Sequence, residues 1–198
     1  MDHVLERMLA AGCTELRVVT RPEKEDVVEH ARALGARVVL AHPETTAASF
    51  AAALVGLDPE DVVLLGWPDT IWEPRDGFVP LVAAVEDGAE IALGLFRIHP
   101  DDLHRSDVVR FAEDGAVDGI EIKPDEPPSE WIWGCAAARA RALGGLDGAE
   151  WPGAHFDACL RAGAHVAAIR LSESWLDIGT HDALERLGDP ELFVNRDY

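Results

Sequence analysis

The sequence lacks a long hydrophobic run and has few cysteines. No apolar stretch approaches the roughly 20 residues that a membrane-spanning helix needs, and no signal peptide is visible. The three cysteines, Cys13, Cys135 and Cys159, are scattered, with no CxxC pair and no Cys/His spacing typical of a zinc site. We therefore expect a protein of a reducing, cytoplasmic compartment that has no membrane partner.

Basic residues are also scarce, and lysine is the scarcest. The chain has 17 Lys and Arg against 37 Asp and Glu, a formal net charge of −20, and its only lysines are Lys24 and Lys123. This charge argues against a nucleic-acid partner, because phosphate backbones are bound by basic stripes. It still allows a small phosphorylated ligand, which needs only a local cation. In an arginine-rich sequence, a remaining lysine points to a site that needs a compact ammonium group.

What the sequence does contain is an alternation of helices and strands. Its 198 residues suffice for one domain with a sizeable core. The apolar run 61–66 is typical of a strand that is buried on both faces. The alternation predicts an α/β fold with a mainly parallel sheet flanked by helices. Helices are expected at about 1–10, 23–34, 46–54, 77–86, 155–162 and 180–187, and strands at 15–20, 36–41, 61–66, 90–96, 131–138 and 165–171.

A β-hairpin interrupts this alternation. Residues 107–112 and 117–123 are predicted to form two strands joined by a Glu-Asp-Gly turn, and a proline-rich loop follows. No repeat or linker is visible. We therefore predict one domain, residues 1–187, with an inserted hairpin and a tail at 188–198. The acidic surface and the tryptophan-rich loops are compatible with a homo-oligomer.

Two aspartates lie where an α/β sheet commonly binds ligands. Asp69, in WPDT, follows the strand 61–66, and ligands of open α/β sheets bind outside the carboxyl ends of strands. Asp177, in WLDIGT, is flanked by apolar residues, and a desolvated carboxylate needs a partner. Each also has a plainer interpretation, as a turn residue. Together they suggest a Mg²⁺ site, because two carboxylates from separate segments often hold one divalent cation.

Lys123 ends the second hairpin strand, in the segment IEIKP. Strand alternation predicts that Ile120 and Ile122 face one side while Glu121 and Lys123 face the other. A lysine beside an acid at a strand end suits a sugar that bears a phosphate. The alternative is an exposed edge lysine that discourages aggregation.

The order of several motifs resembles that of the sugar-1-phosphate nucleotidyltransferases. These motifs are MDHVLERMLAAGCTELRVVT, LLGWPDTIWEP, VVRFAEDGAVDGIEIKP, WIWGCAAA and SWLDIGT, and the branch around glucose-1-phosphate thymidylyltransferase is the most similar. The resemblance implies a Rossmann-like, GT-A-type fold. It also implies an enzyme that joins a nucleoside triphosphate, similar to dTTP or UTP, to a sugar 1-phosphate with release of pyrophosphate. Catalysis would rest on positioning and charge neutralisation, with Mg²⁺ as the cofactor.

The resemblance also assigns roles to residues of this chain. Asp69 and Asp177 match the two Mg²⁺-binding aspartates, and Lys123 matches the lysine that contacts the sugar phosphate. The remaining matched positions are expected to contact substrate: Thr45, Thr46 and Ala48 in the loop that meets the nucleotide base, and Asp107, Glu121, Ile132 and Gly134 in or beside the sugar pocket.

The hairpin departs from the family pattern at two positions. The acidic residue that usually precedes the lysine is Ile122 here, with Glu121 one residue earlier. The glycine that usually precedes the paired valines is Asp107. In the base-contacting loop, Thr and Ala replace Gln or Gly. These changes leave the identity of the base and of the sugar open.

The family's opening strand, its glycine-rich GxGTR loop and a KP segment have no counterpart ahead of the first helix. The loop's N–H groups cradle phosphates, so we expect this chain alone to have little or no activity. The missing strand lies between those that match 15–20 and 61–66, so two sheet edges are expected to stay unpaired. A start codon placed too late explains this better than a degraded copy.

Three functions are compatible with these features. The leading one is Mg²⁺-dependent synthesis of a nucleoside-diphosphate sugar. The alternative is a non-catalytic nucleotidyltransferase-like domain that binds a sugar phosphate or regulates a partner. A GT-A glycosyltransferase that uses a preformed nucleotide sugar is less favoured, because no DxD motif follows a strand.

Overall fold

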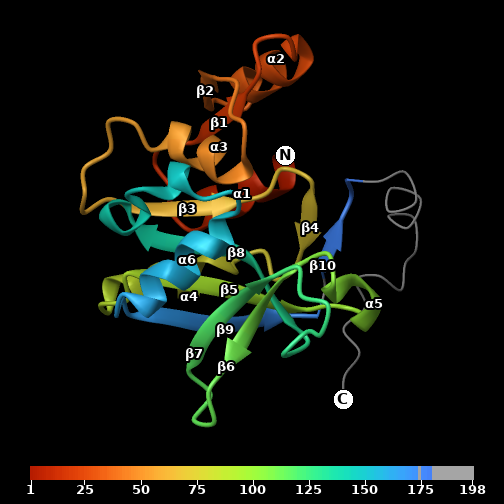
Figure 1. Cartoon of the computed structure of the whole chain (residues 1–198). Coiled ribbons are helices and arrows are strands. Elements are labelled where there is room, and N and C mark those ends of the chain that lie inside the picture. Colours follow the sequence, from red (N-terminus) through yellow and green to blue (C-terminus); the bar gives the residue numbers. More distant parts are fainter. Residues whose placement is uncertain (174, 180–198) are drawn as a thin grey trace.

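A computed structural model describes residues 1–173 and 175–179, and Figure 1 shows their arrangement. The expected helix 180–187 and the tail 188–198 lie outside the described residues. The helices are α1 Asp2–Ala10, α2 Glu25–Ala33, α3 Thr46–Ala53, α4 Phe78–Glu86, α5 Pro100–Leu103 and α6 Pro152–Arg161, with short 3₁₀ turns η1 Ala140–Leu143 and η2 Leu146–Gly148. The strands are β1 Arg17–Thr20, β2 Arg37–Leu40, β3 Val62–Gly66, β4 Thr70–Trp72, β5 Ile91–Arg97, β6 Asp107–Phe111, β7 Val117–Ile122, β8 Trp131–Arg139, β9 Val166–Ser172 and β10 Trp175–Asp177.

In the described part of the chain, six strands form the main sheet, in the order β7-β6-β8-β5-β9, with β3 paired to β8. The long strand β8 runs antiparallel to β3, β5 and β6, and β9 runs parallel to β5. It follows that β3, β5, β6 and β9 point in one direction and that β7 and β8 point in the other. The α/β class with a mainly parallel sheet is therefore confirmed in strand direction, although most individual pairings are antiparallel.

The main sheet forks along β8. One edge of this strand pairs with β5 along most of its length. The other edge pairs with β3 over residues 135–139 and with β6 only at Ile132. The β5 register skips Gly134, so the fork coincides with an irregularity in β8. The fork lets the β6–β7 hairpin, which was expected from the sequence, extend away from the sheet (Figure 1).

The strands β1 and β2 form a separate, parallel two-stranded sheet. Together with α2 they lie at the end of the molecule beyond α3, apart from the main sheet (Figure 1). Within residues 1–173 and 175–179, β1 pairs only with β2, and β3 pairs only with β8. The two unpaired edges expected from the sequence are therefore present.

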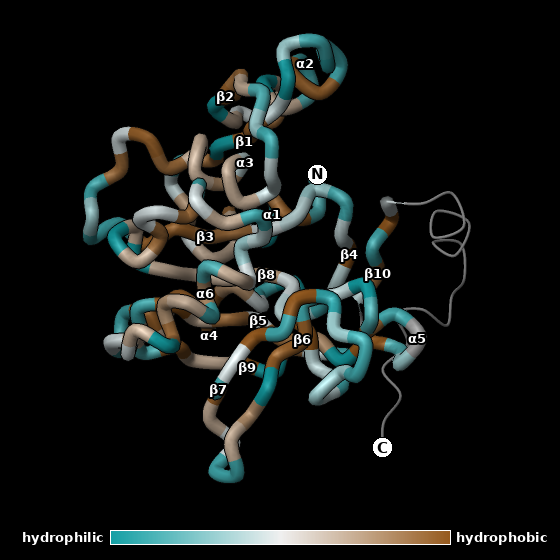
Figure 2. Tube along the Cα trace, in the orientation of Figure 1, coloured by the Kyte–Doolittle hydropathy of each residue, from teal (hydrophilic) through white to brown (hydrophobic). Residues whose placement is uncertain are grey.

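Among the described residues, the core consists of two apolar clusters, each of which contains residues of the central strands. One contains Phe78 and Leu81 of α4, and the other contains Phe156 of α6; all three side chains are fully buried. In Figure 2 the hydrophobic colour follows β3 and β5 through the centre of the molecule. Strand β3 was expected to be buried on both faces. Only Leu65 is buried, because the second edge of β3 has no strand beside it among the described residues.

Two short strands, β4 and β10, and the short helix α5 were not expected from the sequence. The important one is β4, which pairs antiparallel with β10 and forms a small sheet of its own. Across the described ranges, no helix is long and apolar enough to cross a membrane.

Candidate functional site

The pairing of β4 with β10 brings Asp69 and Asp177 together. Asp177 lies opposite Thr70 in the register, and Ile178 N donates a hydrogen bond of 2.8 Å to the carbonyl oxygen of Asp69. Both carboxylates approach Gly179. A methyl group added at Gly179 would lie 3.0 Å from Asp177 Oδ1 and 3.7 Å from Asp69 Oδ2. Asp177 Oδ1 accepts a hydrogen bond of 2.8 Å from Gly179 N, as its plainer interpretation as a turn residue predicts, and Asp69 Oδ2 lies near the same glycine.

The electrostatics of this pair favour a cation. Burial raises the pKa of Asp69, and the negative charge of Asp177 raises it further, while a backbone hydrogen bond opposes both effects. In the described part of the chain, no group of three or more His, Cys, Asp or Glu residues is arranged to hold a metal. Mg²⁺ is commonly held by one or two carboxylates, with substrate phosphates and water completing its shell. The two carboxylates therefore fit Mg²⁺ better than a metal that needs an all-protein site.

Lys123 adopts a backbone conformation that is unusual for a side chain of its size. Its φ is 47°, and it is the one non-glycine residue with a positive φ in the described ranges. Its Nζ lies 3.6 Å from the ring centroid of Trp151, just ahead of α6. The expected alternation is therefore wrong at this residue: left-handed backbone at the strand end redirects Lys123 towards α6, where Ile122 also points.

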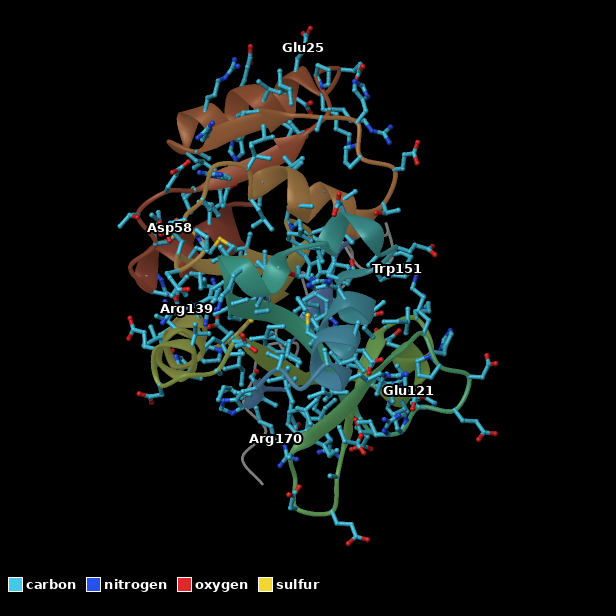
Figure 3. The ribbon with its side chains drawn as sticks, turned by 60° about the vertical axis from the view of Figure 1, so that its left-hand side comes forward. Glu25, Asp58, Glu121, Arg139, Trp151 and Arg170 are labelled. Carbon is cyan, nitrogen blue, oxygen red and sulfur yellow. The ribbon has the colours of Figure 1, made fainter. Side chains whose placement is uncertain are left out.

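Glu121 lies on the other face of the hairpin, as alternation predicts. Its Oε1 accepts a hydrogen bond of 3.0 Å from Arg110 Nη1, and Arg110 also pairs with Asp118. Figure 3 shows Glu121 on the hairpin, apart from Trp151. The structure thus places Glu121 in a surface ion-pair network and does not bring it to Lys123.

Asp107 begins β6 and lies directly opposite Ile122 in the hairpin register. Its Oδ2 accepts a hydrogen bond of 3.3 Å from Trp133 Nε1. The backbone of α6 is close: a methyl group added at Gly153 would lie 2.5 Å from Asp107 Oδ2. Burial raises the pKa of Asp107 to about 6, and the hydrogen bond from Trp133 and the charge of Lys123 only partly oppose this.

Thr45 caps the N-terminus of α3. Its Oγ1 accepts a hydrogen bond of 3.0 Å from Ala48 N and donates one of 3.2 Å to the carbonyl oxygen of Ala149. An open pocket of about 470 Å³ lies at this junction, lined by Glu44, Thr45, Thr46, Asp147, Gly148, Ala149, Glu150 and Trp151. Trp151 lines this pocket and also contacts Lys123, so it connects the pocket lining with the lysine.

Ile132 and Gly134 are placed differently from this group. Ile132 is buried in the core cluster that contains Phe96, whereas its neighbour Trp133 belongs to the other cluster. Gly134 lies under the ring of Trp175, where any added side chain would overlap that ring. The close approach of Trp175 explains why this position is glycine.

A model of the nucleotidyl transferase family matches residues 1–189. The chain belongs to this family. A comparison with curated protein sequences finds no match. The family relationship thus rests on a match that spans both aspartates and the lysine.

Solved structures show the same fold. One is assigned as a glucose-1-phosphate thymidylyltransferase from Bacillus anthracis, in complex with sucrose; it has a TM-score of 0.78 and 19% identity over 100% of this chain and 84% of that one. A UDP-glucose pyrophosphorylase in complex with UDP-glucose has a TM-score of 0.75 and 11% identity over 91% of this chain and 81% of that one. A UDP-glucose pyrophosphorylase from Acinetobacter baumannii has a TM-score of 0.74 and 14% identity over 97% of this chain and 84% of that one. At these identities the similarity establishes the fold.

Two residues beside the candidate site of this nucleotidyl transferase were not predicted from the sequence. Trp151 provides the ring under Lys123, and Gly153 allows the close approach of α6 to Asp107. The only local signal is the Trp-Pro-Gly start of α6, where proline occupies a first-turn position. That signal predicts a helix start, but it does not say which hairpin residue the helix will meet.

Proposed function

We propose that this nucleotidyl transferase joins a nucleoside triphosphate, similar to dTTP or UTP, to a sugar 1-phosphate in a Mg²⁺-dependent reaction that releases pyrophosphate. The observation that carries the proposal is the convergence of Asp69 and Asp177 on the space beside Gly179. These two carboxylates would hold Mg²⁺, which when bound neutralises phosphate charge and orients the phosphates. Phosphoryl and nucleotidyl transfer depend mainly on such positioning and neutralisation.

Lys123 supplies the positive charge for the sugar phosphate. An ammonium group is a compact point charge with three donors, and Trp151 holds it in place through a cation–π contact. The neighbouring pocket at the start of α3 would take the nucleotide base, with Thr45, Thr46 and Ala48 around it. Two structures of the same fold support this assignment, since one is described with sucrose and another with UDP-glucose.

Ligand binding gives the most direct test of the metal site. We expect the protein to bind UTP or dTTP more tightly with Mg²⁺ than without it, measured by isothermal titration calorimetry. Asp69→Asn and Asp177→Asn should each abolish the Mg²⁺-dependent part, whereas Asp125→Asn, an exposed loop change, should retain it. Unchanged Mg²⁺ dependence in both site variants would refute the metal assignment.

The two lysines give a matched pair for the sugar phosphate. Lys123→Met should weaken the binding of glucose, galactose, mannose and N-acetylglucosamine 1-phosphates at least tenfold, while Lys24→Met should leave it unchanged. An assay of pyrophosphate release with the same sugars then tests for turnover. Little or no turnover is expected from this chain alone, so binding that depends on Lys123 without pyrophosphate release is compatible with both the enzyme and the non-catalytic binding domain, whereas pyrophosphate release would exclude the latter.

The compartment and the assembly stay predictions. The three cysteines are free thiols, which is compatible with a cytoplasmic protein. A homo-oligomer would be detected by light scattering after size-exclusion chromatography.

A further inference from the structure

Asp107 is a partly buried carboxylate with few protein partners. A carboxylate can accept about four hydrogen bonds. In the described part of the molecule, Asp107 accepts one, from Trp133 Nε1, and its length of 3.3 Å exceeds the usual range of about 2.7–3.2 Å for N–H···O bonds. A partly buried carboxylate with so few protein partners has acceptor positions left for a ligand.

A structural ion pair does not occupy these positions. Lys123 is near enough for its charge to act on Asp107. However, the Lys123 ammonium group lies over the ring of Trp151, and no ion pair of 4.0 Å or less joins the two residues within the described ranges. The two charges therefore stand apart at one end of the hairpin. A ligand with an anionic group at one end and hydrogen-bond donors at the other would complement both.

The surroundings of Asp107 narrow the chemistry of the ligand. Trp133 and Trp151 contribute indole rings, and Gly153 and Ile122 close the site without adding another charge. Aromatic rings beside a carboxylate suit a ring that bears hydroxyl groups. A hydroxyl that donates to a carboxylate forms a short, charge-assisted hydrogen bond. Such a bond would satisfy the free lone pairs of Asp107.

We propose that Asp107 is a specificity-determining residue that accepts a hydrogen bond from a ring hydroxyl of the sugar whose phosphate is bound by Lys123. This inference rests on the proposed function, since it names a contact within the same sugar-phosphate site. It makes the site selective for a hydroxyl at one ring position. A sugar that lacks this hydroxyl covers the carboxylate without pairing it and is therefore bound more weakly.

The experiment compares Asp107→Asn with the native chain, using glucose 1-phosphate, its monodeoxy analogues and inorganic phosphate, measured by calorimetry at pH 7.5. The native protein should bind one deoxy analogue at least tenfold more weakly than the parent sugar. Asp107→Asn should reduce this ratio to less than threefold and leave inorganic phosphate binding unchanged. Asp125→Asn, which removes the same charge two residues after Lys123, should keep the native ratio. The discrimination of the native protein should also fade below pH 6, because a protonated Asp107 no longer accepts as a carboxylate.

The outcomes separate the inference from the proposed function. If sugar phosphates bind through Lys123 but Asp107→Asn keeps the native ratios, the inference is wrong and the function stands. Tighter binding of every sugar by Asp107→Ala would show that the carboxylate opposes sugar binding, which also overturns the inference. If none of the four sugar 1-phosphates named above binds to the native chain, the proposed function fails and this inference fails with it.

Discussion

Replacing Asp107 by asparagine should make the protein more stable at pH 8. The pKa of Asp107 is raised from 3.8 to about 6 in the folded state. A raised carboxyl pKa means that the folded state holds the proton more tightly than the unfolded state does. The stabilisation from this proton is full below pH 3.8 and is lost as the pH rises through about 6. Above that pH the charged carboxylate destabilises the fold, and asparagine removes the charge while keeping an acceptor for Trp133.

The size of the effect follows from the shift. A pKa that is raised from 3.8 to about 6, at about 1.36 kcal/mol per unit, limits the gain in the free energy of unfolding to about 3 kcal/mol. Partial solvent access reduces this to about 2 kcal/mol at pH 8. At pH 5 the folded protein is mostly protonated at Asp107, so roughly half of the advantage should remain. For a chain of this size, about 2 kcal/mol corresponds to a rise in Tm of about 4–8 °C.

Urea unfolding followed by tryptophan fluorescence at pH 8 and pH 5 measures both values. Asp125→Asn is the control, because it removes the same charge from an exposed loop and should change the free energy of unfolding by less than about 0.5 kcal/mol. The reasoning fails if Asp107→Asn does not raise the free energy of unfolding at pH 8, or if it raises this free energy equally at pH 8 and pH 5.

Two further substitutions test the packing around the site by urea unfolding. Gly134→Ala should lower the free energy of unfolding by about 1–3 kcal/mol, because the new methyl group overlaps the ring of Trp175. Gly148→Ala, where no atom lies within 4 Å, is the matched control; an equal loss in both would disprove the steric cause. Thr45→Ala should cost about 1 kcal/mol by removing the cap that binds Ala48 N, and Thr45→Ser should recover it.

The parts of the fold that were predictable have strong local signals. Strand β5 is a continuous apolar run, and the hairpin is marked by the turn at Gly115, whose φ is 85°. Strand β4 has no such signal. It is only three residues long, and its pairing with β10 stabilises it, which no local pattern reveals.

In the candidate site, too, the residues with a local sequence signal could be predicted, whereas the contacts between distant segments could not. The sequence pointed to Asp69 because it follows a strand end, to Lys123 because it ends a hairpin strand, and to Asp177 because apolar residues flank it. It placed the Lys123 side chain on the wrong face, because one left-handed residue ends the alternation that the prediction assumed. It also treated positions 107 and 122 as two separate departures from the family pattern. The register pairs them directly, so the acid gained at one position faces the apolar residue at the other.

The left-handed backbone of Lys123 has a consequence for protein engineering. A side chain in this conformation costs roughly 1 kcal/mol, which glycine or asparagine would largely relieve. A laboratory selection for heat resistance alone would therefore tend to replace Lys123, and the same selection would favour asparagine at position 107. Both changes would remove charges from the proposed sugar-phosphate site. Variants that survive such a selection should have a higher Tm and a lower affinity for sugar phosphate. The positions at which their substitutions cluster would therefore identify the binding site even when no ligand is known.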